Sequence, residues 1–114
     1  MKVAHTTQNN ILIVTPEADS LDAREAPEFK ELLINLIDQK KLTGVVIDLK
    51  HLRFIDSSGL GSFLSALRVL HTNGGDLKLS HMSKPIRTMF ELVRMHKIFE
   101  IFNTTEDALR SFPK

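Results

Sequence analysis

The sequence predicts a single α/β domain, residues 1–114, with a mixed and mostly parallel sheet of four to five strands and about four helices. Short apolar runs alternate with longer amphipathic runs along the chain, and strands joined through helices form parallel sheets by right-handed crossovers. The length of 114 residues suits one domain, and it allows one hydrophobic core to form without metal or disulfide staples.

The first elements are predicted to be two antiparallel strands followed by a helix. Residues 11–14 form a run rich in strand-forming residues that a Thr-Pro pair ends, and residues 2–6 are expected to pair with it through a turn at 8–10. We expect Asp22 to be the N-cap of the helix and a Thr-Gly pair at 43–44 to end it. This helix is predicted from apolar residues on one face, namely Phe29, Leu32, Leu33, Leu36 and Ile37.

The middle of the chain predicts a buried strand and a second helix. Residues 45–49 begin with three β-branched residues in a row, which suits a strand that is buried on both faces of a sheet. The glycine pair at 74–75 is a natural stop for the helix that follows. The apolar face of this helix consists of Leu60, Phe63, Leu64, Leu67 and Leu70.

The C-terminal third predicts two more strands and two more helices. Residues 76–80 alternate as in a strand, and a Ser-Lys-Pro sequence at 83–85 opens a third helix that bears Val93 near its end. Residues 99–102 are expected to form a short last strand. Thr104 resembles the cap of a final helix that runs through Phe112.

Composition excludes several classes of function. The chain has no cysteine, so disulfides and thiolate metal sites are excluded, and its five histidines lack metal-ligand spacing. The net charge is +1, the basic residues are scattered, and Tyr and Trp are absent, which gives no support for binding to nucleic acid or a membrane. The N-terminus lacks the apolar stretch of a signal peptide, and no apolar run approaches the roughly 20 residues that span a bilayer. We therefore expect a cytoplasmic protein that uses no metal and no cofactor.

Residues 56–61, with the sequence Asp-Ser-Ser-Gly-Leu-Gly, carry the candidate chemistry. They lie between the buried strand and the second helix, and loops at the C-terminal ends of strands form the usual functional edge of an α/β sheet. Asp56, Ser57 and Ser58 are all good N-cap residues, so one of them is expected to cap the second helix. Gly59 and Gly61 permit either a close approach of the backbone or a backbone conformation that other residues rarely adopt.

Taken alone, these residues leave several interpretations open. A Ser-Ser-Gly sequence before a helix is most often a simple cap, and free N–H groups at a helix start also favour anions such as phosphate. The segment is not a P-loop, because no Gly-Lys-Ser/Thr follows it. It also lacks the Gly-x-Ser-x-Gly arrangement of a serine hydrolase, and the sequence places no histidine as its base. A nucleotide site and a serine-nucleophile enzyme are therefore the weaker alternatives.

Residues 45–61 resemble the signature of STAS domains, and specifically that of the bacterial anti-sigma factor antagonists. Two further segments lie where that family has similar ones: residues 21–23 after the second strand, and residues 74–79 after the second helix. The resemblance covers nearly the whole chain. It implies a single STAS-like domain that is not an enzyme and that binds other proteins under the control of phosphorylation.

The resemblance also implies roles for particular residues. In that family, the residue directly before the glycine accepts phosphate from a serine kinase that is usually also the anti-sigma factor; here this residue is Ser58, with Ser57 as the alternative. The unphosphorylated protein, a monomer, is expected to bind the kinase and so release the sigma factor. Phosphorylation breaks the complex, and a metal-dependent serine phosphatase restores it. The residues expected to contact the partner are Asp22, Arg53, Ile55, Asp56, Ser57, Gly59 and Leu60.

Other roles stay open for some residues and for the whole domain. Leu60 lies on the apolar stripe and suits the core, Arg53 suits a solvated loop, and Asp48 suits a structural hydrogen bond better than a cation site. The same fold could serve a stress-sensing scaffold, secretion or motility, because the output belongs to the partner. Direct binding of a small ligand, such as a nucleotide or a lipid, is a further alternative.

Overall fold

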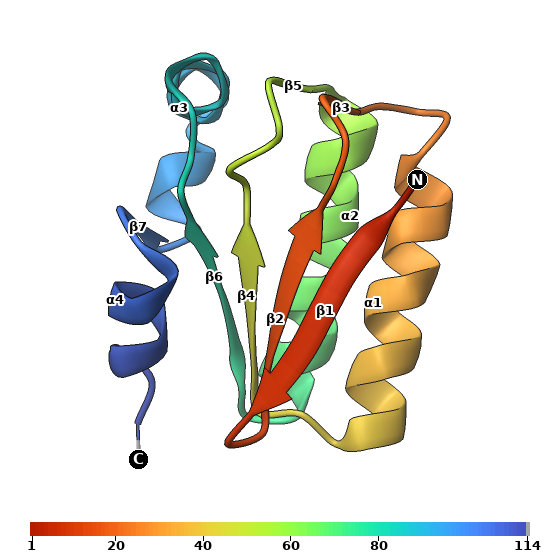
Figure 1. Cartoon of the computed structure of the whole chain (residues 1–114), viewed down its shortest axis with the longest axis vertical. Coiled ribbons are helices and arrows are strands. Elements are labelled where there is room, and N and C mark those ends of the chain that lie inside the picture. Colours follow the sequence, from red (N-terminus) through yellow and green to blue (C-terminus); the bar gives the residue numbers. More distant parts are fainter. Residues whose placement is uncertain (114) are drawn as a thin grey trace.

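The central sheet has five strands in the order β1-β2-β4-β6-β7 (Figure 1). The structure, a computed structural model, describes residues 1–113. β1 and β2 are antiparallel, and the other neighbouring pairs are parallel, which confirms the predicted mixed and mostly parallel sheet. The strands are β1 (Val3–Gln8), β2 (Ile11–Pro16), β4 (Gly44–Asp48), β6 (Asp76–Ser80) and β7 (Ile101–Phe102).

A tight turn of two asparagines joins β1 to β2. Asn9 and Asn10 have φ angles of 53° and 64°, and a two-residue hairpin turn of type I′ requires this left-handed backbone at both positions. The predicted antiparallel pairing is thereby confirmed. Leu12 and Val14 of β2 are fully buried in the main core, whereas most side chains of the edge strand β1 are exposed.

Two long helices cover one face of the sheet, and one short helix covers the other (Figure 1). α1 (Ala26–Lys40) and α2 (Ser57–Thr72) lie side by side over the main core. α4 (Thr105–Arg110) packs against β4, β6 and β7 from the opposite face. α3 (Lys84–Leu92) and the single 3₁₀ turn η1 (Met95–Lys97) lie at the edge of the sheet next to β6 and β7.

Four phenylalanine rings join the helices into one core. Phe63 of α2 lies 6.1 Å from Phe29 of α1, measured between ring centroids. It also lies 6.4 Å from Phe90 of α3 and 6.4 Å from Phe99. Such offset and edge-on pairs are favourable geometries for aromatic rings. The first half of α2 is thereby held between α1 and α3.

The structure differs from the sequence prediction at several short elements. β3 (Ser20–Leu21) and β5 (Phe54–Ile55) form a separate two-stranded parallel sheet that was not predicted, and neither was η1. The last strand is shorter than the predicted 99–102, because Phe99 is buried in the main core instead of pairing in the sheet. α3 ends at Leu92, so Val93 is a half-exposed cap residue and not part of the helix face.

The prediction that Asp22 caps the first helix is wrong. α1 begins at Ala26, its N-cap position is Glu25, and no side chain caps it. The backbone oxygen of Asp22 instead accepts the N–H groups of Glu25 and Ala26 at 3.0 and 2.8 Å. Since this carbonyl and the early Pro27 leave few free donors at the helix start, a side-chain cap is not required.

Asp48 has the structural role that the sequence indicated. Its Oδ1 accepts the backbone N–H of Lys50 at 3.0 Å, and the Thr105 hydroxyl donates to its Oδ2 at 3.4 Å. Lys50 also places its ammonium 3.6 Å from the same oxygen. The Thr105 contact ties the start of α4 to the end of β4, and the Lys50 contacts fix the loop that follows β4.

Candidate functional site at the start of helix α2

Asp56 connects the start of α2 to the loop before α1. Its backbone is extended, and its Oδ1 accepts the N–H of Gly59 at 3.0 Å, so Asp56 is the N-cap among the three candidates. Its other oxygen, Oδ2, accepts the backbone N–H of Ala23 at 3.1 Å. One carboxylate thus fixes both the helix start and a loop that lies 33 residues earlier in the chain.

Gly59 allows the helix to press against the small β3–β5 sheet. A Cβ atom at this position would lie 2.5 Å from the backbone oxygen of Leu21 and 2.6 Å from Cγ1 of Ile55. Of the two roles that the sequence left open for these glycines, Gly59 therefore shows close approach of the backbone, and neither glycine has a positive φ. A Cβ atom at Gly61 would meet nothing within 4 Å.

Ser57 and Ser58 are exposed in the first turn of α2. The first N–H groups of a helix have no partner within the helix, and Asp56 uses its side chain on the N–H of Gly59. The N–H groups of Ser57 and Ser58 therefore remain at the surface, together with the positive end of the helix dipole. The site combines two accessible hydroxyls with a backbone that tolerates an added anion.

Asp22 belongs to the same surface through its neighbour Ala23. Its side chain accepts the backbone N–H of Arg24 at 3.0 Å, and the Arg24 guanidinium lies 3.3 Å from it. These donors, the backbone N–H first, lower the pKa of Asp22 below its ordinary value, so the carboxylate stays charged. The structure thus brings Asp22 and Asp56 to one loop junction.

Ile55 and Leu60 lie below this surface rather than on it. Their exposed fractions are 1% and 6%, and both side chains belong to the main core. Ile55 and Leu60 therefore offer a partner almost no accessible surface area. The burial of Leu60 agrees with its interpretation as a core residue. Their role in the site is to support the backbone that carries the serines.

Arg53 is exposed but does not extend freely into solvent. Its guanidinium donates to the backbone oxygens of Lys50 at 2.9 Å and Leu52 at 3.1 Å. Its backbone N–H donates to the carbonyl of Asp19 at 2.7 Å. Arg53 therefore stiffens the loop that leads to the site while its outer edge stays accessible.

Phe54 is a site neighbour that sequence reasoning missed. It is 50% exposed, although Ile55 beside it in β5 is buried. Alternation of side chains along a strand explains this difference. Because β5 has only two residues, the sequence offers no periodic signal to reveal it.

The described residues show neither a metal site nor a membrane helix. Among residues 1–113, no cluster of three or more His, Asp or Glu side chains is arranged to hold a metal ion. Within the same range, no helix combines the length and apolar character that crossing a membrane requires.

These observations define a small α/β domain with a pair of accessible serines at a capped helix start on the sheet edge. A family model described as "STAS domain" matches residues 2–108. The chain therefore belongs to the STAS domain family, which confirms the resemblance inferred from residues 45–61.

Known proteins similar to this chain bear the name of anti-sigma factor antagonists. The anti-sigma-B factor antagonist of Bacillus subtilis (strain 168) is 29% identical over 103 residues, which are 90% of this chain and 93% of the relative. Among solved structures, an anti-sigma-factor antagonist (STAS) domain protein from Planctomyces limnophilus matches with a TM-score of 0.87 at 15% identity, covering 96% of each chain.

The fold also matches the Bacillus protein SpoIIAA in two chemical forms. The unphosphorylated anti-sigma factor antagonist SpoIIAA matches with a TM-score of 0.74 at 21% identity, covering 97% of this chain and 100% of SpoIIAA. The phosphorylated form gives the same TM-score and identity, with coverage of 96% and 97%. At this level of identity the match shows a shared fold.

Proposed function

We propose that this protein is an anti-sigma factor antagonist whose binding to an anti-sigma factor serine kinase is abolished by phosphorylation of Ser58. The unphosphorylated form binds the kinase and so releases the sigma factor. A metal-dependent serine phosphatase reverses the modification. The observation that carries the proposal is the exposed Ser58 at the start of α2, in a STAS chain whose relatives bear this name.

The position of Ser58 supports its role as a substrate rather than a catalyst. Its side chain is accessible to a kinase, and it directly precedes Gly59, as in the family pattern that the sequence resembles. Ser57 is equally accessible and is the alternative acceptor. Solved structures of SpoIIAA in both phosphorylation states support the idea that this fold carries the modification. Because the proposed kinase uses ATP and sigma factors act in the cytoplasm, the proposed location of the protein is the cytoplasm.

A phosphate on Ser58 changes the charge of the surface more than its shape. Phosphoserine adds a charge of about −1.5 to −2 at pH 7. The free N–H groups and the dipole of α2 accommodate this charge within the domain. Asp56 already places a negative charge at the junction, whereas the charge of Asp22 is paired with Arg24. A partner that packs apolar or acidic groups there therefore loses affinity. A loss of about 3–4 kcal/mol weakens binding by two to three decades.

The contact surface that we propose differs in part from the sequence prediction. Asp22, Arg53, Asp56 and Ser57 form its polar part. Gly59 contributes through the helix position that it permits, and Ile55 and Leu60 contribute from below. Phe54 adds an exposed ring at one side, and the open space around Gly61 leaves room for a partner's side chain to approach α2.

Phosphorylation mapping tests this proposal. The full chain is incubated with its serine kinase and ATP, and the peptides are analysed by mass spectrometry together with Ser57→Ala and Ser58→Ala variants. We expect one phosphate on Ser58 in the wild type and in Ser57→Ala, and none in Ser58→Ala. Phosphate that remains in Ser58→Ala moves the acceptor to Ser57, and a chain that is never phosphorylated contradicts the proposed switch.

A further inference from the structure

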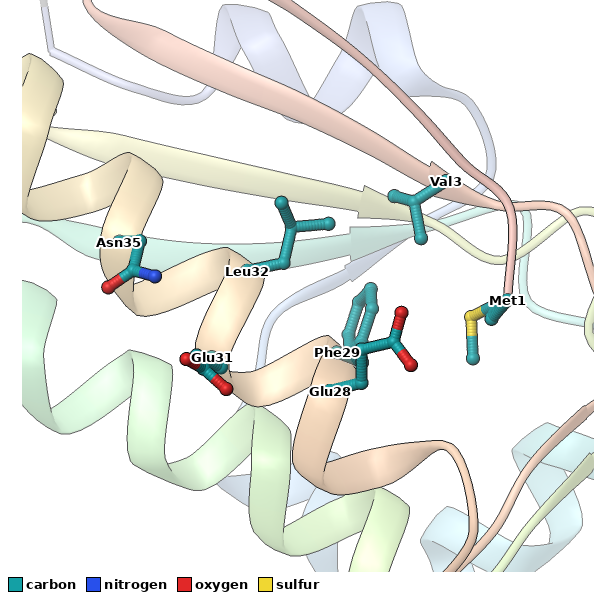
Figure 2. A pocket seen from close by; sticks show the side chains of 7 residues that line it. All are labelled: Met1, Val3, Glu28, Phe29, Glu31, Leu32 and Asn35. Carbon is teal, nitrogen blue, oxygen red and sulfur yellow. The ribbon is translucent and has the colours of Figure 1, made fainter.

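The side of the molecule formed by β1 and α1 carries a small apolar pocket with an acidic lining. The pocket has a volume of about 270 Å³, and its polar side chains include two glutamates (Figure 2). We call it the acidic pocket. Its lining residues are Met1, Val3, Glu28, Phe29, Glu31, Leu32 and Asn35.

The size and charge of the acidic pocket favour a protein side chain as its occupant. A volume of 270 Å³ is below the range of roughly 300–1,000 Å³ that small-molecule sites usually have. Within residues 1–113, neither Glu28 nor Glu31 makes an ion pair. The N-terminal ammonium of Met1, which also lines the pocket, pairs with Glu25 at 3.3 Å. Two carboxylates without an ion-pair partner beside an apolar cavity fit an aliphatic side chain that is flanked by basic residues.

A surface of this kind is present at the end of α3. Leu92, Val93 and Ile98 are large apolar residues with exposed fractions of 75%, 43% and 52%. We call these three residues and their basic neighbours the basic corner. Scattered single apolar side chains are normal on protein surfaces, whereas these three lie within seven positions of sequence, around the end of α3 and η1.

Residues 84–98, which include the basic corner, carry a net positive charge, and two of their basic residues, Arg94 and Lys97, lie between the exposed apolar residues in sequence. Between residues 84 and 98 there is one acidic residue, Glu91, and four basic ones, which gives a net charge of +3. Since the whole chain carries +1, the remaining residues carry −2. In the described part of the chain none of the four basic side chains makes an ion pair. They are Lys84, Arg87, Arg94 and Lys97.

The two patches of one molecule cannot reach each other. α1 and α3 lie on opposite sides of the fold, with α2 between them (Figure 1). From their opposite charges and matching apolar character, we propose that the basic corner of one molecule docks in the acidic pocket of a second copy of this chain. Leu92, the most exposed of the three apolar residues, enters the pocket, and Arg94 and Lys97 approach the two glutamates.

Such a contact joins two different surfaces and therefore has a characteristic behaviour. After docking, one molecule of the pair keeps a free pocket and the other keeps a free corner, so the association is head to tail and continues as concentration rises. The contact is small and charged, so it is weak, and the protein is a monomer when dilute. Screening of exposed charges makes the association decrease with added salt.

Sedimentation velocity tests the proposal with the full chain alone. We expect the weight-average sedimentation coefficient to rise between about 20 µM and 1 mM at low salt, and to stay at the monomer value in about 0.5 M salt. Leu92→Glu replaces the apolar side chain that is proposed to enter the pocket with a charged one. Glu31→Lys reverses one charge at the pocket. Each single variant is expected to weaken association at least tenfold, whereas Asp38→Lys, the same reversal on α1 but outside the pocket, leaves it within twofold.

A mixture of the two variants distinguishes a head-to-tail contact from any symmetric dimer. Leu92→Glu retains an intact pocket and Glu31→Lys retains an intact corner, so an equimolar mixture is expected to form dimers that grow no further. Circular dichroism and thermal unfolding confirm that each exposed substitution leaves the fold intact. A wild type that stays monomeric at low salt, a variant that associates like the wild type, or a mixture that stays monomeric overturns the proposal.

Discussion

Gly59 and Gly61 lie two residues apart in the first turns of α2, but their surroundings differ. At Gly59 a new Cβ atom would collide with a backbone oxygen at 2.5 Å, which cannot move without moving β3. We expect Gly59→Ala to lower the free energy of unfolding by about 2 kcal/mol or more. Gly61→Ala meets open space and improves helix propensity, so it is expected to raise the free energy of unfolding by about 0.5–1 kcal/mol.

Urea denaturation of the two glycine variants measures this difference directly. Each variant serves as the control of the other, because both make the same substitution in the same helix. If the two variants change stability in the same direction, the close packing of α2 against the β3–β5 sheet is not as described.

Asp56 makes two hydrogen bonds with one side chain, and its replacement should reveal both. Asp56→Ala removes the bonds to Gly59 and Ala23, so we expect a loss of about 1–3 kcal/mol in the free energy of unfolding. Asp56→Asn keeps one acceptor oxygen and is expected to lose less. Ser57→Ala, an exposed neighbour, should change stability by less than about 0.5 kcal/mol. An Asp56→Ala variant as stable as Ser57→Ala would show that the two hydrogen bonds of Asp56 do not stabilise the fold.

The hydrogen bonds of the Asp22 carboxylate predict that its contribution to stability falls as the pH is lowered. Because the Arg24 backbone N–H and guanidinium lower its pKa in the folded state, its contribution to stability is complete above the ordinary value of 3.8. That contribution is lost as the pH falls through the lower folded value. Carboxyl ¹³C NMR should give a titration midpoint below 3.8. In Arg24→Ala the backbone donor remains, so the midpoint should rise only part of the way; a wild-type midpoint at or above 3.8 contradicts these contacts.

Among the elements, the long ones follow from local pattern and the short ones do not. The buried run of β4 and the apolar stripes of α1 and α2 are strong periodic signals, and the structure confirms all three. β3 and β5 have two residues each, and they exist because Leu21 and Ile55 pair across 34 positions of sequence. No local pattern encodes such a pairing.

The same limit explains what the sequence could predict of the site. Asp56, Ser57 and Ser58 have similar N-cap preferences, so the sequence narrows the cap to three residues. In the structure Asp56 is the cap because its Oδ1 accepts the N–H of Gly59, and its Oδ2 also accepts the N–H of Ala23, a tertiary contact that no local pattern encodes. The prediction of Asp22 as the N-cap of α1 fails for a related reason, because its backbone carbonyl, and not its side chain, accepts the N–H groups at the start of the helix.

α4 is held on the sheet by a nearly buried lysine. The Lys78 ammonium donates to the backbone oxygen and the hydroxyl of Ser111 at 3.2 and 2.7 Å. It also lies 4.4 Å from the centroid of the Phe112 ring and 3.3 Å from a Glu100 oxygen. Since α4 has only six residues, these contacts and a small apolar cluster determine whether it stays docked.

Removal of Lys78 should therefore loosen α4 before the rest of the fold. In Lys78→Ala we expect amide hydrogen exchange across residues 105–112 to accelerate at least tenfold, the effect of losing about 1.5–3 kcal/mol of charged hydrogen bonds. Exchange in α1 should change much less. Lys78→Met keeps the aliphatic stem and is the matched control, with a smaller effect expected. Uniform acceleration across all elements would show that α4 is not a separate unit.

At the scale of the whole molecule, the proposed phosphorylation site lies outside the hydrophobic core. The hydroxyl of Ser58 lies outside the core, while Gly59 and Leu60 directly after it are buried. In the switch that we propose, a phosphate on Ser58 alters the surface that faces a partner and leaves the phenylalanine core in place.

The affinity of the kinase for the two forms of the full chain tests the central claim most directly. Titration calorimetry compares the unphosphorylated protein with the Ser58-phosphorylated protein, and backbone amide NMR shifts verify that both are folded alike. We expect the phosphate to weaken binding by two to three decades, equal to about 3–4 kcal/mol, with shift changes confined to the start of α2 and the loops beside it. Equal affinity of the two forms, or shift changes throughout the core, would contradict a phosphate switch at the surface.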